Sequence, residues 1–381
     1  MSRSPDVAVI GGGIIGCSAA AILAERGVAV TLFEATGIGA GASGRNLGAI
    51  QHPFDAVLAH LYRASLEHYW GLATLDDGFT LAAEPAGVLM LNRDPDGSRR
   101  QVAHLNAIAP DLGADFMDTD AVAAAEPSLV PGFAACRLAT GYPVPPAWAT
   151  AAYERLAVRR GAQIRVGAAA TPWVEDGQVR GVQLGDGSRV AAGAVLVAAG
   201  PWSPLLVDPT GGWEPIHRTW GVTVQLDLGA ATPTRVIEED AVDAVNRSLA
   251  ADARAAGGAP EADPSTLFTV AAAAGVSTLG STFLPREPDP APIARLLIER
   301  GARNLPAIGT ARVREIRVCA RPQSVDGRPF IGQVGGVAGL FVCAGHGPWG
   351  ISTGPASAEL VVNALLDGTP VPNELAADRP F

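Results

Sequence analysis

The sequence predicts an α/β fold, and three observations lead to that prediction. The stretch Val7–Glu34 combines a short apolar run, three consecutive glycines, a helical pattern and a second apolar run, which is typical of a parallel strand–helix–strand unit. Further wholly apolar runs occur at Ala194–Ala199 and Leu340–Ala344. The chain is 48% hydrophobic and 17% charged, with 45 Gly and 30 Pro, which is typical of a globular protein rich in loops. At 381 residues it is long enough for two or three domains.

The glycines after the first strand have the spacing of a dinucleotide-binding turn. Gly11 allows the tight turn, Gly13 lets the backbone approach a pyrophosphate, and Gly16 lets helix and strand pack closely. The following helix, which Gly27 ends, presents its positive N-terminus to that anion. Glu34 closes the second strand, eighteen residues after Gly16, where it can accept hydrogen bonds from a ribose. Its charge disfavours NADP, and this stretch leaves FAD and NAD open.

Helical patterns recur along the chain. Each has apolar residues near helical spacing or a capping residue at its start, such as Asp118. The predicted helices after Ile14–Arg26 are Ala56–Asp76, Arg99–Ala109, Ala121–Glu126, Ala147–Arg160, Pro290–Arg300 and Ser352–Leu366. Residues 235–264 are acidic, rich in alanine and weakly patterned, so both a helix and a surface insertion remain open.

Strand patterns lie between these helices. Asp176-Gly177 and Asp186-Gly187 are hairpin signals, and Gly141–Pro146 is a rigid turn that indicates a domain crossing. The predicted strands, in addition to the apolar runs, are Gly87–Asn92, Gln163–Val166, Thr219–Leu228, two within Leu267–Leu284, and Arg312–Ala320.

Composition excludes several classes of function. A net charge of −10 disfavours nucleic acid and anionic membranes as partners. All 28 basic residues are arginine, which excludes a Schiff-base lysine. Cys17, Cys136, Cys319 and Cys343 lack metal-binding spacing, so we expect free thiols and no metal site. The fingerprint starts at residue 7, and no apolar run is long enough to span a bilayer, so we expect a soluble cytoplasmic protein.

Four pieces together resemble the FAD-dependent D-amino-acid oxidase family, especially its glycine oxidase and sarcosine oxidase branch. They are the N-terminal fingerprint, the loop Ser43–Asn46, the strand ending in Ala199-Gly200-Pro201-Trp202, and the C-terminal segments 321–332 and 339–350. The resemblance implies a discontinuous Rossmann-like FAD-binding domain and a substrate domain with a mostly antiparallel sheet. Composition shifts agree with FAD-binding parts at 1–80, 145–218 and 316–381 and substrate parts at 81–144 and 219–315.

The resemblance also implies which residues contact non-covalent FAD. These residues come from four segments: the glycine turn, the loop after Glu34, the end of the strand Ala194–Ala199, and the backbone around His346. The backbone amides around His346 would stabilise negative charge on the flavin. The predicted cofactor-binding residues are Gly11, Gly13, Ile14, Ile15, Gly16, Glu34, Ala35, Ala42, Ser43, Arg45, Asn46, Leu47, Gly48, Ala199, Gly200, Trp202, Gly345, His346, Gly347, Trp349, Gly350 and Ile351. Cys319 lies near where the sarcosine branch attaches its flavin covalently, which is the minority alternative.

For the substrate, the resemblance implies that Arg321 binds a carboxylate. A planar guanidinium grips a carboxylate at two points and orients the neighbouring C–H bond. Gly347, Pro348 and Trp349 are predicted to border the substrate, and the absence of bulk at Gly347 is predicted to admit a larger amine. His52, after the loop, is a candidate base.

The implied reaction is oxidation of the C–N bond of an amino acid or N-substituted glycine, with hydride transfer to flavin N5 and an imine that hydrolyses. Reoxidation by O2 to H2O2 is expected. The family's oxygen-reactive lysine is absent, however, so another electron acceptor remains open. Alternatives are a 2-hydroxy-acid dehydrogenase, which would need His52 or His346 as a base, a flavin-binding subunit of a hetero-oligomer, and an NAD dehydrogenase. A homo-oligomer is also open.

Overall fold

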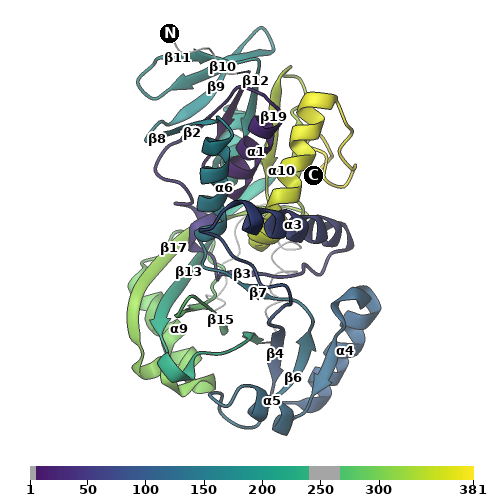
Figure 1. Cartoon of the computed structure of the whole chain (residues 1–381), viewed down its shortest axis with the longest axis vertical. Helices are drawn as coiled ribbons and strands as arrows, with labels where there is room; N and C mark the ends of the chain where they lie inside the picture. Colours follow the sequence, from purple (N-terminus) through teal and green to yellow (C-terminus); the bar gives the residue numbers. More distant parts are fainter. Residues whose placement is uncertain (1–5, 240–266) are drawn as a thin grey trace.

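The computed structural model describes residues 6–239 and 267–381, which form two units built on separate sheets (Figure 1). The upper unit in that view contains a six-stranded sheet with helices packed on it, and the lower unit contains an eight-stranded sheet. Helix α3 (Ala56–Leu75) lies close to the junction of the two units.

The six-stranded sheet has the order β18-β19-β12-β1-β2-β8, and all neighbouring pairs are parallel except β18 with β19. Strand β1 lies in the interior of the sheet, between β12 and β2. Its four residues are all apolar and buried. The strands are β1 (Val7–Ile10), β2 (Val30–Glu34), β8 (Gln163–Val166), β12 (Ala194–Val197), β18 (Phe330–Gln333) and β19 (Leu340–Ala344).

Helices and a small sheet cover the two faces of this parallel sheet. Helix α1 (Ile14–Glu25) packs between α6 (Trp148–Arg159) and α10 (Gly350–Asp367), and α10 in turn packs on α3. A three-stranded sheet, β9 (Ala170–Glu175), β10 (Gln178–Leu184) and β11 (Arg189–Ala191), shares a second apolar core with β1 and β12. The central strands are therefore buried on both sides, which explains their apolar runs.

The eight-stranded sheet has the order β17-β13-β16-β15-β14-β4-β6-β5, antiparallel except for the parallel pair β14–β4. Its longest pairing joins β13 (Ile216–Asp227) to β17 (Arg312–Ser324). The remaining strands are β4 (Val88–Asn92), β5 (Asp115–Met117), β6 (Ala134–Leu138), β14 (Val236–Glu239), β15 (Thr269–Ala273) and β16 (Val276–Gly280). Helices α4 (Pro95–Ile108), α5 (Thr119–Ala125) and α9 (Pro290–Asn304) cover it.

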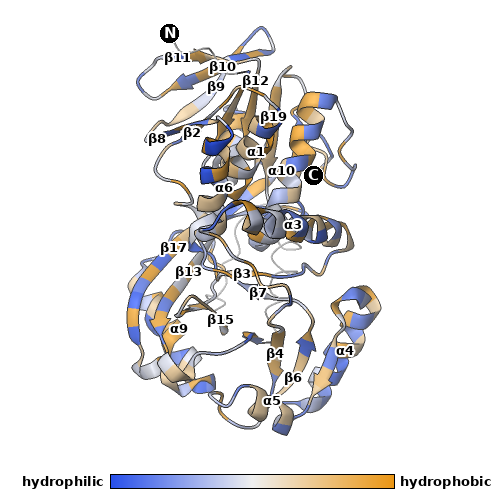
Figure 2. Ribbon diagram, viewed as in Figure 1, coloured by the Kyte–Doolittle hydropathy of each residue, from blue (hydrophilic) through white to orange (hydrophobic). Residues whose placement is uncertain are grey.

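Short elements connect the two units. Strands β3 (Ala49–Ile50) and β7 (Tyr142–Pro143) pair with each other, and the one-turn helix α2 (Ala42–Arg45) contacts β17. The short helix α7 (Ser203–Val207) follows β12. In Figure 2, β12 and β19 are largely hydrophobic, whereas α4 mixes hydrophilic and hydrophobic residues, as expected for a helix with one exposed face.

The α/β fold is confirmed, and each predicted strand and helix is present, but some differ in extent and several elements were not predicted. Strand β17 continues to Ser324, so Arg321 lies within a strand rather than after one. Strands β3, β5, β6, β7, β14 and β18 and the short helices α2 and α7 were not predicted, and α4 begins four residues early, at Pro95, where Asp94 caps it. Of residues 235–264, Val236–Glu239 form β14, and positions 240–264 lie outside the described residues. The five domain segments stay a prediction, and two of their boundaries fall inside β13 and β17.

Across residues 6–239 and 267–381, no helix is long and apolar enough to cross a membrane. Within the same ranges, no cluster of three His, Cys, Asp or Glu side chains is arranged to hold a metal ion. All four cysteines are buried and free of disulfides, as the sequence predicts.

Candidate functional site

The turn after β1 brings three backbone segments into contact. Gly11 has a φ of +113°, and a β carbon there would lie 2.4 Å from the carbonyl oxygen of Ala198 at the end of β12. A β carbon on Gly16 would lie 1.9 Å from the oxygen of Gly11. Both positions therefore require glycine, because the carboxyl end of β12 and the first turn of α1 approach the loop too closely for any side chain.

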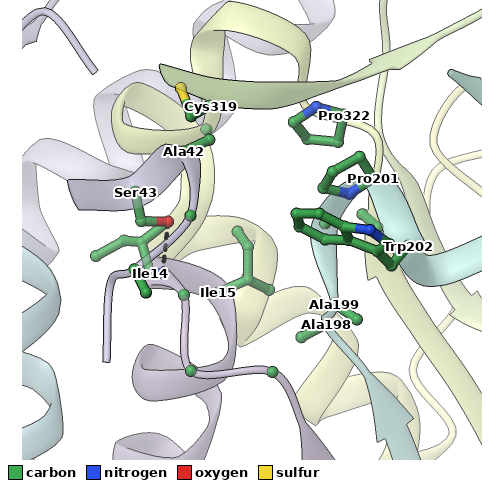
Figure 3. Close-up of a pocket in the computed structure, with 18 of the residues that line it drawn as sticks. Ile14, Ile15, Ala42, Ser43, Ala198, Ala199, Pro201, Trp202, Cys319 and Pro322 are labelled. Carbon is green, nitrogen blue, oxygen red and sulfur yellow. Dashed lines mark hydrogen bonds between the residues drawn. The ribbon is translucent and has the colours of Figure 1, made fainter. Parts of the chain in front are cut away.

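Two side chains hold this loop in place. Ser43 Oγ accepts a hydrogen bond of 3.0 Å from the backbone N–H of Ile14 at the start of α1 (Figure 3). Glu34 Oε2 accepts one of 2.7 Å from Gly12, and its other oxygen accepts from the N–H and hydroxyl of Thr36. The helix N-terminus and the acid thus lie at the same sheet edge, as the fingerprint predicts.

A single cavity of about 1060 Å³ extends from this edge to the eight-stranded sheet. It lies between the two units, so residues from four separated stretches of the chain, within 10–51, 169–206, 238–283 and 319–352, meet in it. Most predicted cofactor and substrate residues line it. These are Gly11, Gly13, Ile14, Ile15, Glu34, Ala35, Ala42, Ser43, Arg45, Asn46, Leu47, Ala199, Gly200, Trp202, Arg321, His346, Gly347, Pro348, Trp349, Gly350 and Ile351. In Figure 3, Pro201, Trp202 and Pro322 lie on one side of this space and Ile14 and Ser43 on the other.

Arg321 is held inside the cavity by uncharged partners. Its Nη1 donates to the carbonyl oxygen of Thr282 at 2.8 Å, and its Nη2 donates to Ser281 Oγ at 2.6 Å. The guanidinium also lies 4.7 Å from the ring centre of Phe283. Burial lowers its pKa from the ordinary value, and no carboxylate among the described residues forms an ion pair with it.

Arg317 and Arg45 join residues 42–48, which are predicted to contact the cofactor (the cofactor loop), to strand β17, which carries Arg321. Arg317, which is 6% exposed, donates to the carbonyl oxygens of Gly44 and Asn46 at 3.3 and 3.1 Å. Arg45 donates in the opposite direction, to the carbonyl oxygen of Val318 at 2.8 Å. The loop that begins with α2 is therefore fastened to β17 from both sides.

His346 lines the cavity in a neutral form. It is 2% exposed, and burial lowers its pKa to about 3. Its Nε2 is buried without a hydrogen-bond partner among the described residues. The next residue, Gly347, has a φ of +54°, and a β carbon there would lie 2.9 Å from Gln323 Oε1.

Residues 6–364 match the family described as FAD dependent oxidoreductase. The chain belongs to this family. It is 29% identical to the bifunctional protein of tRNA 5-methylaminomethyl-2-thiouridine biosynthesis from Chromohalobacter salexigens, over 97% of this chain and 54% of that protein. It is 26% identical to glycine oxidase from Bacillus licheniformis, over 98% of this chain and 96% of that one. Its fold matches the crystal structure of glycine oxidase from Bacillus cereus with a TM-score of 0.81 and 24% identity, over 96% of each chain.

The oxidoreductase spans about half the length, or less, of several curated relatives that it matches. The residues present fit FAD. The glycine turn lets the backbone come close to a pyrophosphate, and the cavity runs continuously from this turn to the eight-stranded sheet. Burial raises the pKa of the Cys319 thiol, which disfavours the thiolate that a covalent link requires. The comparisons give no indication of such a link.

Four predicted residues do not line the cavity, namely His52 and the three glycines Gly16, Gly48 and Gly345. Gly16, Gly48 and Gly345 instead pack against backbone or neighbouring side chains, where a β carbon would meet Gly11, Val144 or Ile216. Their role in this oxidoreductase is to let elements approach each other. We expect them to shape the site rather than to contact the cofactor.

His52 requires a correction, because the structure places it outside this cavity. It is 5% exposed, packs edge-on against Tyr62 with 5.1 Å between ring centres, and lines a separate cavity of about 280 Å³ beside α3. Burial lowers its pKa. The sequence shows that His52 follows the cofactor loop but not that β3 turns it away, so we no longer assign it as a base.

Several cavity residues were missed by the sequence analysis. Most lie in or next to β14, β15 and β16, whose sequence is weakly patterned, and one follows β3. They are Gln51, Glu238, Thr269, Ser281 and Phe283. The alternating faces of these strands are the signal that would have found them, once the strand order was known.

Proposed function

We propose that this FAD-dependent oxidoreductase oxidises the C–N bond of an amino acid or N-substituted glycine. The observation that carries the proposal is the cation at Arg321, held by Ser281 Oγ and the Thr282 carbonyl inside the cavity that the glycine turn also lines. The similarity to glycine oxidase over nearly the whole of both chains supports it.

The guanidinium of Arg321 binds the substrate carboxylate. Since two of its N–H groups are already engaged, its orientation is fixed before the substrate arrives, which lowers the entropic cost of binding. The bound carboxylate then holds the adjacent C–H bond over the cofactor. Bound FAD supplies the acceptor for the hydride, and the electrons then pass to O2, giving H2O2, or to another acceptor. Water hydrolyses the resulting imine.

The protonation state of the cavity favours an amine over a hydroxy acid. Oxidation of a C–O bond needs a base to take the hydroxyl proton, whereas a neutral amine needs none. His346, with a pKa of about 3, is a weak base, and His52 lies elsewhere. The prediction that Gly347 admits a larger amine is not supported, because Gln323 Oε1 lies 2.9 Å from where a β carbon on Gly347 would stand.

The experiment is an anaerobic titration of the purified holoprotein with glycine, sarcosine, N-alkyl glycines and D-amino acids, followed by the absorbance of oxidised flavin. Bleaching by one class supports the proposal, and loss of about 100-fold in the second-order rate in Arg321→Met, with partial recovery in Arg321→Lys, assigns the carboxylate site. Admission of air then separates O2 from other acceptors. Bleaching by 2-hydroxy acids alone, or no bleaching by any of these compounds, would overturn it.

A further inference from the structure

The pairing of β13 with the chain that follows β16 contains a β-bulge. Val224 is paired with Leu279. If the ladder continued regularly, Trp220 would lie opposite position 283, but it exchanges backbone hydrogen bonds of 2.7 and 2.9 Å with Leu284 instead. One extra residue therefore lies on the β16 side of the ladder, in the segment 281–283, which we call the bulge. Bulges often occur next to active sites, where they redirect side chains.

The bulge leaves one backbone N–H of β13 without a carbonyl partner. A regular ladder would pair Val222 with Ser281, but Ser281 exchanges backbone hydrogen bonds of 2.7 and 2.9 Å with Leu267. The N–H of Val222, which is fully buried, instead donates to Thr282 Oγ1 at 2.9 Å. The hydroxyl of Thr282 thus takes the place of a backbone carbonyl in the sheet. Because a buried N–H without an acceptor is costly, the fold depends on this bond.

The carbonyl of Thr282, which Val222 does not use, binds the guanidinium of Arg321. It accepts a hydrogen bond of 2.8 Å from Nη1, and the hydroxyl of Ser281 accepts one of 2.6 Å from Nη2. The ring centre of Phe283 lies 4.7 Å from the guanidinium carbon. All three residues of the bulge therefore contact Arg321. Ser281 and Phe283 also line the cavity, whereas Thr282 is fully buried.

Loss of the Thr282 hydroxyl would therefore affect the guanidinium. Without Oγ1, the N–H of Val222 needs another acceptor, and the carbonyl is the remaining acceptor of the same residue. A carbonyl that turns towards this N–H moves away from Arg321 Nη1. Because a displacement of about 1 Å in a binding group can cost about 100-fold in rate, a small rotation of this peptide group is enough to weaken substrate binding.

We propose that the bulge positions Arg321 for carboxylate binding and that Thr282 is the positioning residue that makes this possible. Its hydroxyl satisfies the N–H of Val222, so its carbonyl is free to orient the guanidinium. The oriented cation then discriminates a carboxylate from an uncharged carboxamide of the same shape. This rests on the proposed function, in which Arg321 binds the substrate carboxylate.

Unreactive ligands report on the guanidinium without turnover. The probes are butanoate and its isostere butanamide, titrated into oxidised holoprotein at pH 7 and followed by the perturbed flavin spectrum. We expect the unmodified protein to bind butanoate about 30-fold more tightly, as charged hydrogen bonds allow. Thr282→Val keeps the shape but removes the hydroxyl, and it should reduce this preference about tenfold. Thr282→Ser retains the hydroxyl and should keep the preference.

The preference separates positioning from a general loss of structure. A structural defect alone would weaken both ligands by the same factor and leave their ratio unchanged. Thr150→Val is the matched control, because Thr150 of α6 is equally buried and its hydroxyl has no hydrogen-bond partner among the described residues. This variant should keep the preference of the unmodified protein.

The outcomes distinguish this inference from the proposed function. If the unmodified protein binds both ligands equally, or if Arg321→Met keeps the preference, the carboxylate site fails and the role of Thr282 with it. If Arg321→Met removes the preference but Thr282→Val keeps it, the positioning role is overturned and the carboxylate site stands. If Thr282→Val does not retain FAD, Ser281→Ala replaces it. Removal of this contact from the same bulge should reduce the preference about threefold or more, and an unchanged preference would overturn the inference.

Discussion

Arg321 lies across the bare backbone of Gly221. A β carbon at position 221 of β13 would stand 2.4 Å from Nη1 and 2.7 Å from Cζ of Arg321, a separation that no real contact shows. Gly221 is paired with Cys319, two residues before Arg321 on β17, so the guanidinium extends diagonally over β13 towards Ser281. Because Gly221 on β13 has no side chain, the guanidinium of Arg321 on the neighbouring strand β17 has room to lie there.

Gly221→Ala should therefore displace the guanidinium without removing it. Because a shift of about 1 Å in a binding group can cost about 100-fold in rate, we expect kcat/KM for carboxylate substrates to fall by that order while FAD remains bound. The measurement is steady-state kinetics together with the flavin content of the purified protein. Gly71→Ala, at a position of α3 where a β carbon would meet nothing within 4 Å, is the control and should leave both unchanged. Wild-type kinetics in Gly221→Ala would refute the role of this glycine.

Arg317→Met should weaken FAD binding. The substitution removes the donors to the carbonyl oxygens of Gly44 and Asn46, so the loop that presents Ser43 to α1 loses its anchor on β17. We expect the dissociation constant for FAD to rise about tenfold, which corresponds to the loss of about one charged hydrogen bond. Fluorescence of FAD released on dilution measures it. Arg314→Met, on the same strand but paired with Asp227 at the surface, is the control. Equal release from both variants would contradict the prediction.

Asp76→Asn should lower the free energy of unfolding at neutral pH and make it depend less on pH between about 4 and 2. Hydrogen bonds from Arg155, together with those from Arg159, lower the pKa of the buried Asp76 carboxyl to about 2. A lowered folded pKa means that the contribution is present above the ordinary value near 4 and is lost as pH falls from about 4 to 2. We expect a loss of about 2 kcal/mol at pH 7 and a smaller loss at pH 3.

Urea unfolding of Asp76→Asn at pH 7 and pH 3 measures this difference. Asp96→Asn is the control. Asp96 is exposed, and its Oδ1 lies as far as 4.0 Å from Arg99 Nε, so this ion pair is weak. The same loss at both pH values would show that the pairing with α6 does not set the acid dependence.

Local patterns predicted the elements well because each depends on neighbouring residues. The apolar run Val7–Ile10 is buried on both faces, and Gly11 and Gly13 follow it in the order that a pyrophosphate turn demands. The nucleotide edge of the cavity could therefore be predicted residue by residue. The assignment of Arg321 to the site depended on the resemblance of its surrounding segment, and the structure places it in the cavity.

Long-range register could not be predicted in this way. Glu238 and Glu239 look equivalent in sequence, and only the pairing of β14 with β15 shows that one faces the cavity and the other faces Arg300. His52 follows the cofactor loop closely but packs on Tyr62. Gly221 carries no local signal at all, since its role depends on a side chain one hundred positions later.

The sequence by itself determined the α/β class, the glycine turn, the acid at Glu34 and the family, because these depend on spacing along one stretch of chain. The tertiary structure decided which polar side chains share the cavity. Strands β13, β14, β15, β16 and β17 come from widely separated segments, and their hydrogen-bond register places Arg321, Gly221 and Glu238 on one face. Side-chain direction alternates along a strand, so a shift of one residue in that register would reverse each assignment.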